Sequence, residues 1–268
     1  LWKMPHQLFN RNMTQKLIVE KIEHIATIVI NNPSANTWDL ESLSGLEKII
    51  SELNQDKNIS ALVITGQGEK FFSAGADLKV FHEGGKEAAK SMSDAFSKAF
   101  KSLSEFSGVS IAAINGFAMG GGLECALACD LRVAENKAIL ALPEPKVGLL
   151  PCGGGTQILP RLVGEGWAKR IILTGEQIKP DLALKIGLIE EKADDGKSFE
   201  VAMEIAKSVA NQSPTSIALC KELIHKARLS NQSYDEELKP FVDLFDTKDQ
   251  KEGVEAFLEK RKPEWQNA

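Results

Sequence analysis

The chain has 268 residues, which is enough for one large domain or for a core with a small appendage. Apolar residues make up 43% and charged residues 26% of the chain, as in ordinary globular proteins. The net charge is −5 without a long basic run, which argues against nucleic acid as the main ligand. No stretch approaches the roughly 20 apolar residues of a membrane span, so we expect no membrane partner.

The cysteines and the first residues of the chain indicate in which compartment of the cell the protein acts. Four cysteines form no disulfide framework, and no secretory signal precedes them, which favours a reducing, intracellular compartment. We expect a cytoplasmic protein of bacterial type, and we consider the mitochondrial matrix the less favoured location. Residues 1–12 contain no acidic residue and begin without methionine. We interpret them as an expression or upstream remnant ahead of a native start at Met13, and less favourably as part of a targeting segment.

The first elements alternate between strand and helix patterns. Residues 17–31 are rich in β-branched side chains and predict two strands around Glu23. A turn-rich stretch follows, and apolar positions at helical spacing then predict a helix from about Asp39, which can cap it, to Leu53. The continuous apolar run at 59–65 predicts a buried strand.

The alternation continues towards the middle of the chain. FFSAGADLK (71–79) is predicted as a loop or a strand end, and GVSIAAIN (108–115) as a buried strand. A glycine triplet and a short helix (123–129) come next, followed by strand candidates at 131–135 and 138–142. Strands that alternate with helices predict an α/β core.

Beyond Gly153 the pattern is helical almost throughout. We therefore predict an α/β core with the active site over residues 13–195 and a helical region over residues 196–268. No internal repeat is visible in the sequence.

The triplet Gly120–Gly122 is the first candidate for chemistry. It lies between a strand and a helix, where glycines let the backbone approach a ligand and the first helical N–H groups lack partners. Such a turn can form an oxyanion hole or a phosphate cradle. A glycine-rich turn that serves only close packing is the equally weighted alternative.

Two glutamates are the candidate acid–base groups. Glu124 lies in the first turn of the helix after the triplet, among apolar neighbours. It could simply complement the helix dipole, but a buried carboxylate is costly without a role. Glu144 lies between Pro143 and Pro145, which hold the loop stiffly, as a general acid requires. Alone, it would be interpreted as an exposed loop residue.

Other constellations do not support a cofactor or a metal. Cys125 and Cys129 share a helix face, but no second Cys or His pair lies nearby, so buried apolar cysteines are favoured. The sequence has no complete dinucleotide fingerprint, phosphate-binding P-loop or nucleophile elbow.

Three ordered motifs, SAGADLK, IAAINGFAMGGGLECALACD and LPEPKVGLLPCGGGTQILPRLVG, resemble the crotonase superfamily, and most closely its enoyl-CoA hydratases. The likeness runs from about Leu17 to Trp265. It implies an α/β fold with a crotonase-like ββα spiral core and a helical C-terminal region that forms trimers, often paired as hexamers. It also implies an acyl-CoA thioester substrate, no metal and no cofactor, since coenzyme A enters as part of the substrate.

The resemblance also assigns the site. The two catalytic glutamates fall on Glu124 and Glu144, and the oxyanion hole falls on the N–H groups of Ala76 and Gly121. Positions matched to substrate or coenzyme A binding are Ala35, Ala74, Gly75, Ala76, Asp77, Leu78, Lys79, Gly120, Phe257 and Lys260. In the family, the last two positions reach the coenzyme A of a neighbouring subunit.

The implied reaction is syn addition of water across the α,β double bond of a trans-2-enoyl-CoA, which gives a 3-hydroxyacyl-CoA. Glu124 and Glu144 would hold one water between them, and Glu144 would supply the α proton. The main alternatives are an enoyl-CoA isomerase, which typically lacks a glutamate matching Glu124, and a methylglutaconyl-CoA-type hydratase. NPSANTW departs from the commoner family pattern, which leaves the acyl preference open. An RNA-binding relative and a scaffold without catalysis are weaker alternatives.

Overall fold

A computed structural model describes residues 16–227, 243 and 246–268. The predicted remnant at residues 1–12 and the predicted start at Met13 lie outside the described residues. No helix in the described ranges combines the length and the apolar character that a membrane crossing requires.

Among the described residues, the main sheet has six strands in the order β1-β2-β3-β5-β7-β9. β1 and β2 form an antiparallel hairpin, and the other neighbours pair in parallel. The predicted strands at 17–31, 59–65, 108–115 and 131–135 are confirmed. In order, the strands span Leu17–Ile22, Ile25–Ile30, Ala61–Gly66, Val109–Ile114, Leu131–Glu135 and Glu191–Ala193.

A smaller sheet lies beside it, with three parallel strands in the order β4-β6-β8 within the described part of the chain. Each strand follows one strand of the main sheet after a short turn, and a helical segment comes next. The same unit thus occurs as β3-β4-α2, β5-β6-α3 and β7-β8 followed by η1 and α4. This repeated ββα unit confirms the α/β spiral fold that the resemblance implied. The segments span Phe71–Ser73 (β4), Leu78–Ser104 (α2), Phe117–Met119 (β6), Gly121–Ala128 (α3), Ile139–Ala141 (β8), Glu144–Val147 (η1, a 3₁₀ turn) and Gly155–Thr174 (α4).

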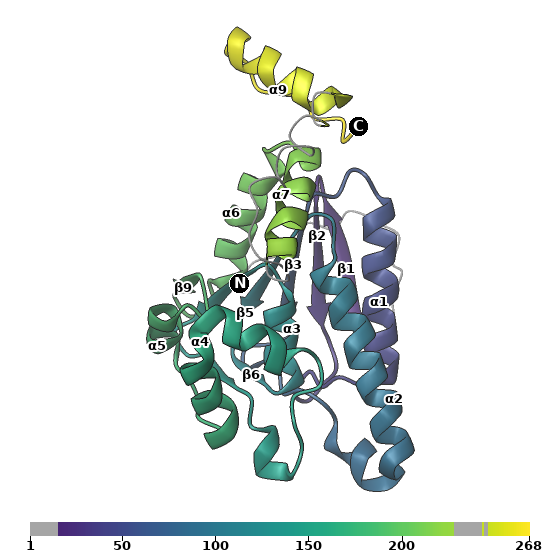
Figure 1. The fold of residues 1–268 in the computed structure, drawn as a ribbon, viewed down its shortest axis with the longest axis vertical. Helices are drawn as coiled ribbons and strands as arrows, with labels where there is room; N and C mark the ends of the chain where they lie inside the picture. Colours follow the sequence, from purple (N-terminus) through teal and green to yellow (C-terminus); the bar gives the residue numbers. More distant parts are fainter. Residues whose placement is uncertain (1–15, 228–242, 244–245) are drawn as a thin grey trace.

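Helices cover both faces of the main sheet, which explains why its central strands β3 and β5 are mostly apolar and almost entirely buried. Alternate residues of each strand point to opposite faces. Ile28, Leu62 and Ile64 belong to the core cluster shared with α1 (Leu40–Gln55) and α2, whereas Val63 packs in a second cluster with α6 (Ser198–Ala210). Figure 1 shows α1 and α2 on one side of the sheet and α6 on the other.

The elements that were not predicted from the sequence include α2, β6, η1 and β9. The 27-residue helix α2 contains the pair Gly84–Gly85, and glycine is a poor helix former. Its buried positions Met92, Phe96, Phe100 and Leu103 nevertheless keep helical spacing and hold it against the core. The strand β9 has only three residues, two of them exposed, and it lies near the end of the predicted core, beyond Gly153, where the sequence pattern is helical almost throughout.

The predicted helix after the turn-rich stretch is confirmed as α1, with its cap. The carboxylate of Asp39 accepts a hydrogen bond from the N–H of Ser42 at 2.9 Å, and the Ser42 side chain accepts the N–H of Asp39 in return. This capping box fixes where the turn-rich segment ends and the helix begins.

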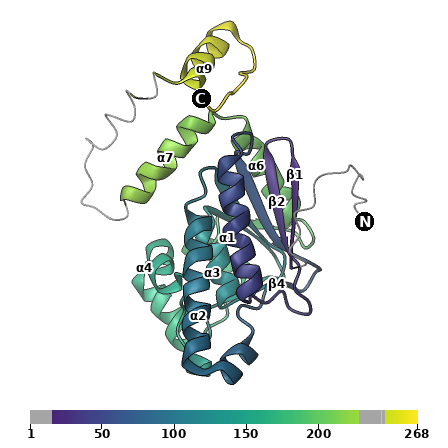
Figure 2. The same cartoon turned by 90° about the vertical axis from the view of Figure 1, so that its right-hand side faces the viewer.

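The last helices differ in how they pack. α5 (Pro180–Ile186) contacts β9, and α6 packs on the main sheet, whereas α7 (Pro214–Ala227) buries none of its residues. α7 and α9 (Lys248–Glu259) project from the body formed by the sheets and the other helices (Figure 2). The division of the chain near residue 195 stays a prediction.

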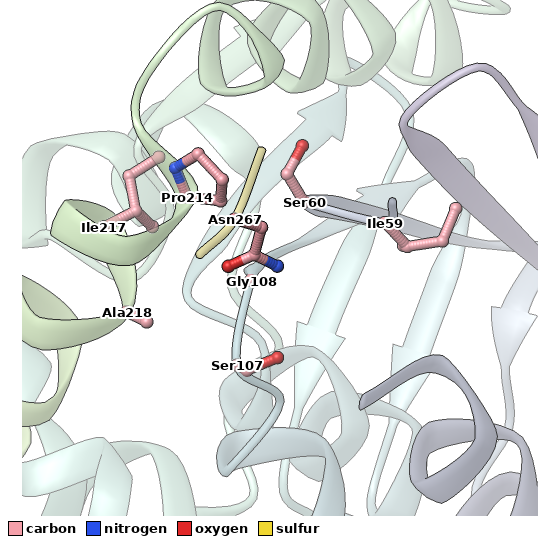
Figure 3. A pocket seen from close by; sticks show the side chains of 8 residues that line it. All are labelled: Ile59, Ser60, Ser107, Gly108, Pro214, Ile217, Ala218 and Asn267. Carbon is pink, nitrogen blue, oxygen red and sulfur yellow. The ribbon is translucent and has the colours of Figure 1, made fainter. Parts of the chain in front are cut away.

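One lysine ties α7 to the body. The ammonium group of Lys221 donates to the carbonyl oxygens of Phe106 (2.6 Å) and Gly108 (2.9 Å) and to the carboxylate of Asp130 (2.7 Å). Beside this contact lies a cavity of about 30 Å³ (Figure 3). Its lining residues are Ile59, Ser60, Ser107, Gly108, Pro214, Ile217, Ala218 and Asn267. Polar contacts rather than a shared apolar core therefore attach the arm formed by α7 and α9.

Candidate active site

The small parallel sheet brings the three sequence motifs together. Parallel strands end at the same edge of a sheet, where ligand sites of α/β proteins form. β4 runs into the loop 74–77, β6 into Gly120 and β8 into the segment that carries Glu144. The N–H of Gly120 donates to the carbonyl of Ala141 at 2.9 Å, which joins two of these strand ends. Motifs nearly 70 residues apart in the chain thus meet at one edge.

The loop 74–77 lies in backbone contact with the glycine triplet. A Cβ at Gly75 would lie 2.6 Å from the carbonyl oxygen of Met119 and 3.0 Å from the amide nitrogen of Gly121, so no side chain fits there. Gly75 also has φ +89, which favours glycine. These two features explain why glycine stands at this position.

Within the part of the chain that the structure describes, two backbone N–H groups in this contact donate no hydrogen bond. Ala76 bridges to Trp38 through the N–H groups of Trp38 and Asp77, and its own N–H takes no part in that bridge. Gly121 is the first residue of α3, and the first N–H groups of a helix have no acceptor within the helix. The helix dipole adds positive potential there. The pair therefore has the chemistry of an oxyanion hole.

Glu124 lies on α3, one turn into the helix, and is 2% exposed. Its Oε1 accepts hydrogen bonds from the N–H groups of Gly153 and Gly155, both at 2.8 Å. A Cβ on Gly153 or Gly155 would lie only 2.9 or 3.0 Å from a carboxylate oxygen of Glu124. We call these two N–H groups the glycine clamp. The clamp was not predicted from the sequence. The sequence feature that corresponds to it is the run Gly153–Gly155, which follows Pro151 and Cys152.

Glu144 begins the 3₁₀ turn η1 and is only partly buried. Its Oε2 atom is buried and has no hydrogen-bond partner among the described residues. Its Oε1 faces the triplet, because a Cβ on Gly120 would lie 3.2 Å from it. The turn is closed by hydrogen bonds from the N–H of Lys146 to Pro143 and from the N–H of Leu149 to the carbonyl of Glu144. The carboxyl group thus points at the glycine triplet with one oxygen unpaired.

The environments of the two carboxyl groups differ in a way that separates their roles. Burial raises the pKa of Glu124, but the N–H groups of Gly155 and Gly153 oppose the rise because they stabilise the carboxylate. Burial raises the pKa of Glu144 to about 7, and the nearby charge of Glu124 adds to the rise. Glu124 is therefore suited to act as a base and Glu144 as an acid near neutral pH.

The structure places the other predicted binding residues in two regions. Ala35 lies beside the loop 74–77, because its carbonyl accepts the N–H of Ala74 at 2.9 Å. Leu78 and Lys79 open α2, but their side chains lie outside what the structure describes.

Phe257 lies in α9, and the exposed Lys260 follows that helix. Both belong to the projecting arm, away from α3 within one protomer (Figures 1 and 2). Their contact with coenzyme A stays a prediction, as do the roles of the other site residues.

Cys125 of α3 and Cys129, the C-cap of that helix, are buried and poorly reactive. Burial raises the pKa of Cys129 to about 12 and raises that of Cys125 well above its usual value. A thiol that stays protonated is a weak nucleophile and a weak metal ligand. Within the described ranges, no group of three or more His, Cys, Asp or Glu residues is placed to hold a metal. The expected absence of a metal stays a prediction.

The raised pKa of Glu144 predicts a stability cost. The folded protein holds this proton more tightly than the unfolded chain does, so ionisation destabilises the fold as the pH rises from about 4.5 to about 7. Glu144→Gln mimics the neutral acid and should raise the free energy of unfolding at about pH 8 by on the order of 1 kcal/mol, and by less at about pH 5. Urea denaturation at both pH values measures the difference. The exposed Glu69→Gln should change little at either pH. Equal stabilisation at both pH values would contradict the assignment.

Known proteins resemble this chain over nearly its whole length. Residues 20–268 match the model of the enoyl-CoA hydratase/isomerase family. A short-chain-enoyl-CoA hydratase of Clostridium acetobutylicum is 37% identical over 92% of this chain and 96% of that protein. The structure of Pseudomonas aeruginosa DspI is 57% identical, with a TM-score of 0.92 over 96% of this chain and 98% of the other. An enoyl-CoA hydratase from Bacillus anthracis is 35% identical, with a TM-score of 0.91 over 95% and 100% of the two chains. The chain therefore belongs to the enoyl-CoA hydratase/isomerase family of the crotonase superfamily, whose enzymes act on acyl-CoA thioesters.

Proposed function

We propose that this protein is an enoyl-CoA hydratase, a hydro-lyase that adds water to the α,β double bond of a trans-2-enoyl-CoA and forms a 3-hydroxyacyl-CoA. The observation that carries the proposal is the pair of unlike carboxyl groups. Glu124 accepts two N–H hydrogen bonds, and Glu144 has a raised pKa and an unpaired oxygen beside the glycine triplet. Relatives named as hydratases support it.

The proposed reaction begins with the substrate thioester oxygen bound by the N–H groups of Ala76 and Gly121. These donors stabilise the negative charge that develops on the oxygen when the double bond is attacked. The carboxylate of Glu124 takes a proton from a water molecule, and the hydroxide oxygen bonds to the β carbon. Glu144 gives its proton to the α carbon on the same face, which completes syn addition. Proton transfer from Glu124 back to Glu144 restores the starting state.

Both carboxyl groups should be required for hydration. We expect Glu124→Gln and Glu144→Gln each to lower kcat with crotonyl-CoA by on the order of 10²–10⁴, because each removes one acid–base group. Loss of the enoyl-thioester absorbance measures the reaction, and a 3-enoyl-CoA substrate tests isomerisation in parallel. Two results together would favour the isomerase alternative. The wild-type protein would fail to hydrate crotonyl-CoA, and the Glu124→Gln variant would isomerise the 3-enoyl-CoA at the wild-type rate. A branched enoyl-CoA with a carboxylate tests the methylglutaconyl-CoA-type alternative.

The pH dependence should reflect one proton shared by the pair. Hydration needs Glu124 ionised and Glu144 protonated. At low pH Glu124 is protonated as well, so kcat/KM should fall. It should also fall above about pH 7 as Glu144 loses its proton. Initial rates with crotonyl-CoA at constant ionic strength measure the profile. A rate that stays constant to about pH 9 would contradict the role of Glu144 as the acid.

We also propose that the chain forms a homotrimer or a hexamer of paired trimers, and that it acts in the cytoplasm. The projecting arm supports assembly, because α7 buries none of its residues and Ile224 and Val254 are 61% and 49% exposed. Apolar side chains exposed on a projecting helix pair are typical of subunit interfaces. Sedimentation velocity should show a trimer or a hexamer for the wild-type protein. The variant Ile224→Glu should shift the distribution of species towards smaller oligomers. A wild-type monomer would exclude the proposal.

A further inference from the structure

We propose that three aromatic side chains, Trp38, Phe96 and Phe100, act together as positioning residues. They keep the oxyanion hole and the glycine clamp of Glu124 in fixed positions relative to each other. We call them the aromatic triad. The proposal rests on the proposed hydratase function, and it concerns residues that do not touch the reacting atoms. Nothing in the family resemblance assigns a role to these three rings.

The triad is a buried stack that joins α2 to the turn-rich segment before α1. Trp38 is 0% exposed, and Phe96 and Phe100 are each 2% exposed. Phe96 and Phe100 lie one helical turn apart, with ring centroids 5.4 Å apart and planes at 65°. Trp38 meets Phe100 edge to face at 5.7 Å and 78°. Close-packed rings of this kind resist local displacement.

Each phenylalanine ring touches one glycine of the site. A Cβ on Gly121 would lie 2.7 Å from Cε1 of Phe96, so the ring lies directly against the start of α3. A Cβ on Gly153 would lie 2.7 Å from Cδ2 of Phe100, so this ring supports the glycine that donates to Glu124. The oxyanion hole and the clamp therefore rest on neighbouring rings of one helix.

The tryptophan holds the third part of the site through its backbone. Its N–H donates to the carbonyl of Gly75 at 2.8 Å, and its carbonyl accepts the N–H of Asp77 at 3.2 Å. These bonds bracket Ala76, whose N–H would form half of the oxyanion hole. The indole Nε1 of Trp38 is buried and has no hydrogen-bond partner in the described part of the chain. Packing rather than side-chain hydrogen bonding therefore keeps this ring in place.

The two phenylalanines should affect different parts of catalysis. A smaller side chain at position 96 loosens Gly121 in the oxyanion hole, which binds no proton. A smaller side chain at position 100 loosens Gly153 and weakens an N–H bond that favours the ionised form of Glu124. The titratable groups that act on Glu124 are Glu144 on η1 and the thiol of Cys152 before α4, and burial and the two carboxylates raise the pKa of that thiol to about 11. The uncharged ring of Phe100 alters neither charge.

The test compares Phe96→Leu and Phe100→Leu with Phe106→Leu. Phe106 is an equally buried phenylalanine just beyond α2 that contacts Gly108 and Lys221 instead of the site. We expect both triad variants to lower kcat for crotonyl-CoA by about 10- to 100-fold, with KM changed less than about threefold, because misplaced catalytic groups mainly affect the transition state. Only Phe100→Leu should also move the acid limb of kcat/KM to higher pH. Phe106→Leu should lose stability but keep kcat and the pH profile.

The outcomes separate this inference from the proposed function. If the wild-type protein does not hydrate enoyl-CoA, the proposed function fails. If it does, but all three variants lose only stability and keep kcat and the acid limb, the triad is purely structural and the inference fails. Phe100→Met, whose unbranched and flexible side chain reaches further than that of leucine and adapts to the gap left by the ring, should restore kcat and the acid limb towards wild type, and it also serves if Phe100→Leu does not fold. Amide exchange at Gly153 should be faster in Phe100→Leu than in Phe106→Leu, and equal rates would contradict the inference.

Discussion

The site depends above all on the parallel pairing of three very short strands. β4, β6 and β8 have three residues each, yet their shared direction places three strand ends at one edge. The strands then continue into three different segments, which are the loop around Ala76, the triplet before α3, and the turn that carries Glu144. At this edge, Gly75 has no room for a side chain because backbone approaches backbone, and Gly153 has none because the side chains of Phe100 and Glu124 lie against it. Fixed dipoles and carboxyl groups can be held there without rearrangement during a reaction.

The ends of α3 show how the larger fold supports this edge. Its first residues face the site, and its last residues are held by Arg132 of β7, which is 2% exposed. The guanidinium donates to the carbonyls of Cys129 at 2.9 Å and Leu188 at 3.0 Å, and it pairs with Glu190. A positive charge near the C-terminus of a helix complements the helix dipole. The main sheet thus anchors the far end of the helix whose beginning carries Gly121 and Glu124.

Much of the fold could be predicted from the sequence because its signals were local, whereas the site residues were assigned through the family resemblance and their roles stay predictions. The β-branched runs predicted the strands, and the capping signal at Asp39 marked the start of α1. The ββα repeat is not visible in the sequence, because it is a repeat of backbone geometry and each unit ends in a different motif. α2 was missed because a glycine pair masks its apolar stripe, although tertiary packing of Phe96 and Phe100 holds it. The clamp at Gly153 depends on contact with a residue 29 positions earlier, which local spacing cannot reveal.

The unequal surroundings of Glu124 and Glu144 also bear on reversibility. Hydration converts one neutral acyl chain into another, so its equilibrium does not depend on pH, and both directions must use the same protonation state of the enzyme. A coupled pair that holds a single proton meets this requirement. In the proposed reaction, the pair would add water with the proton on Glu144 and remove water with the proton on Glu124. The concentrations of the two thioesters would then set the direction of the proposed reaction, and each addition of water would leave the proton on Glu124 until it returns to Glu144.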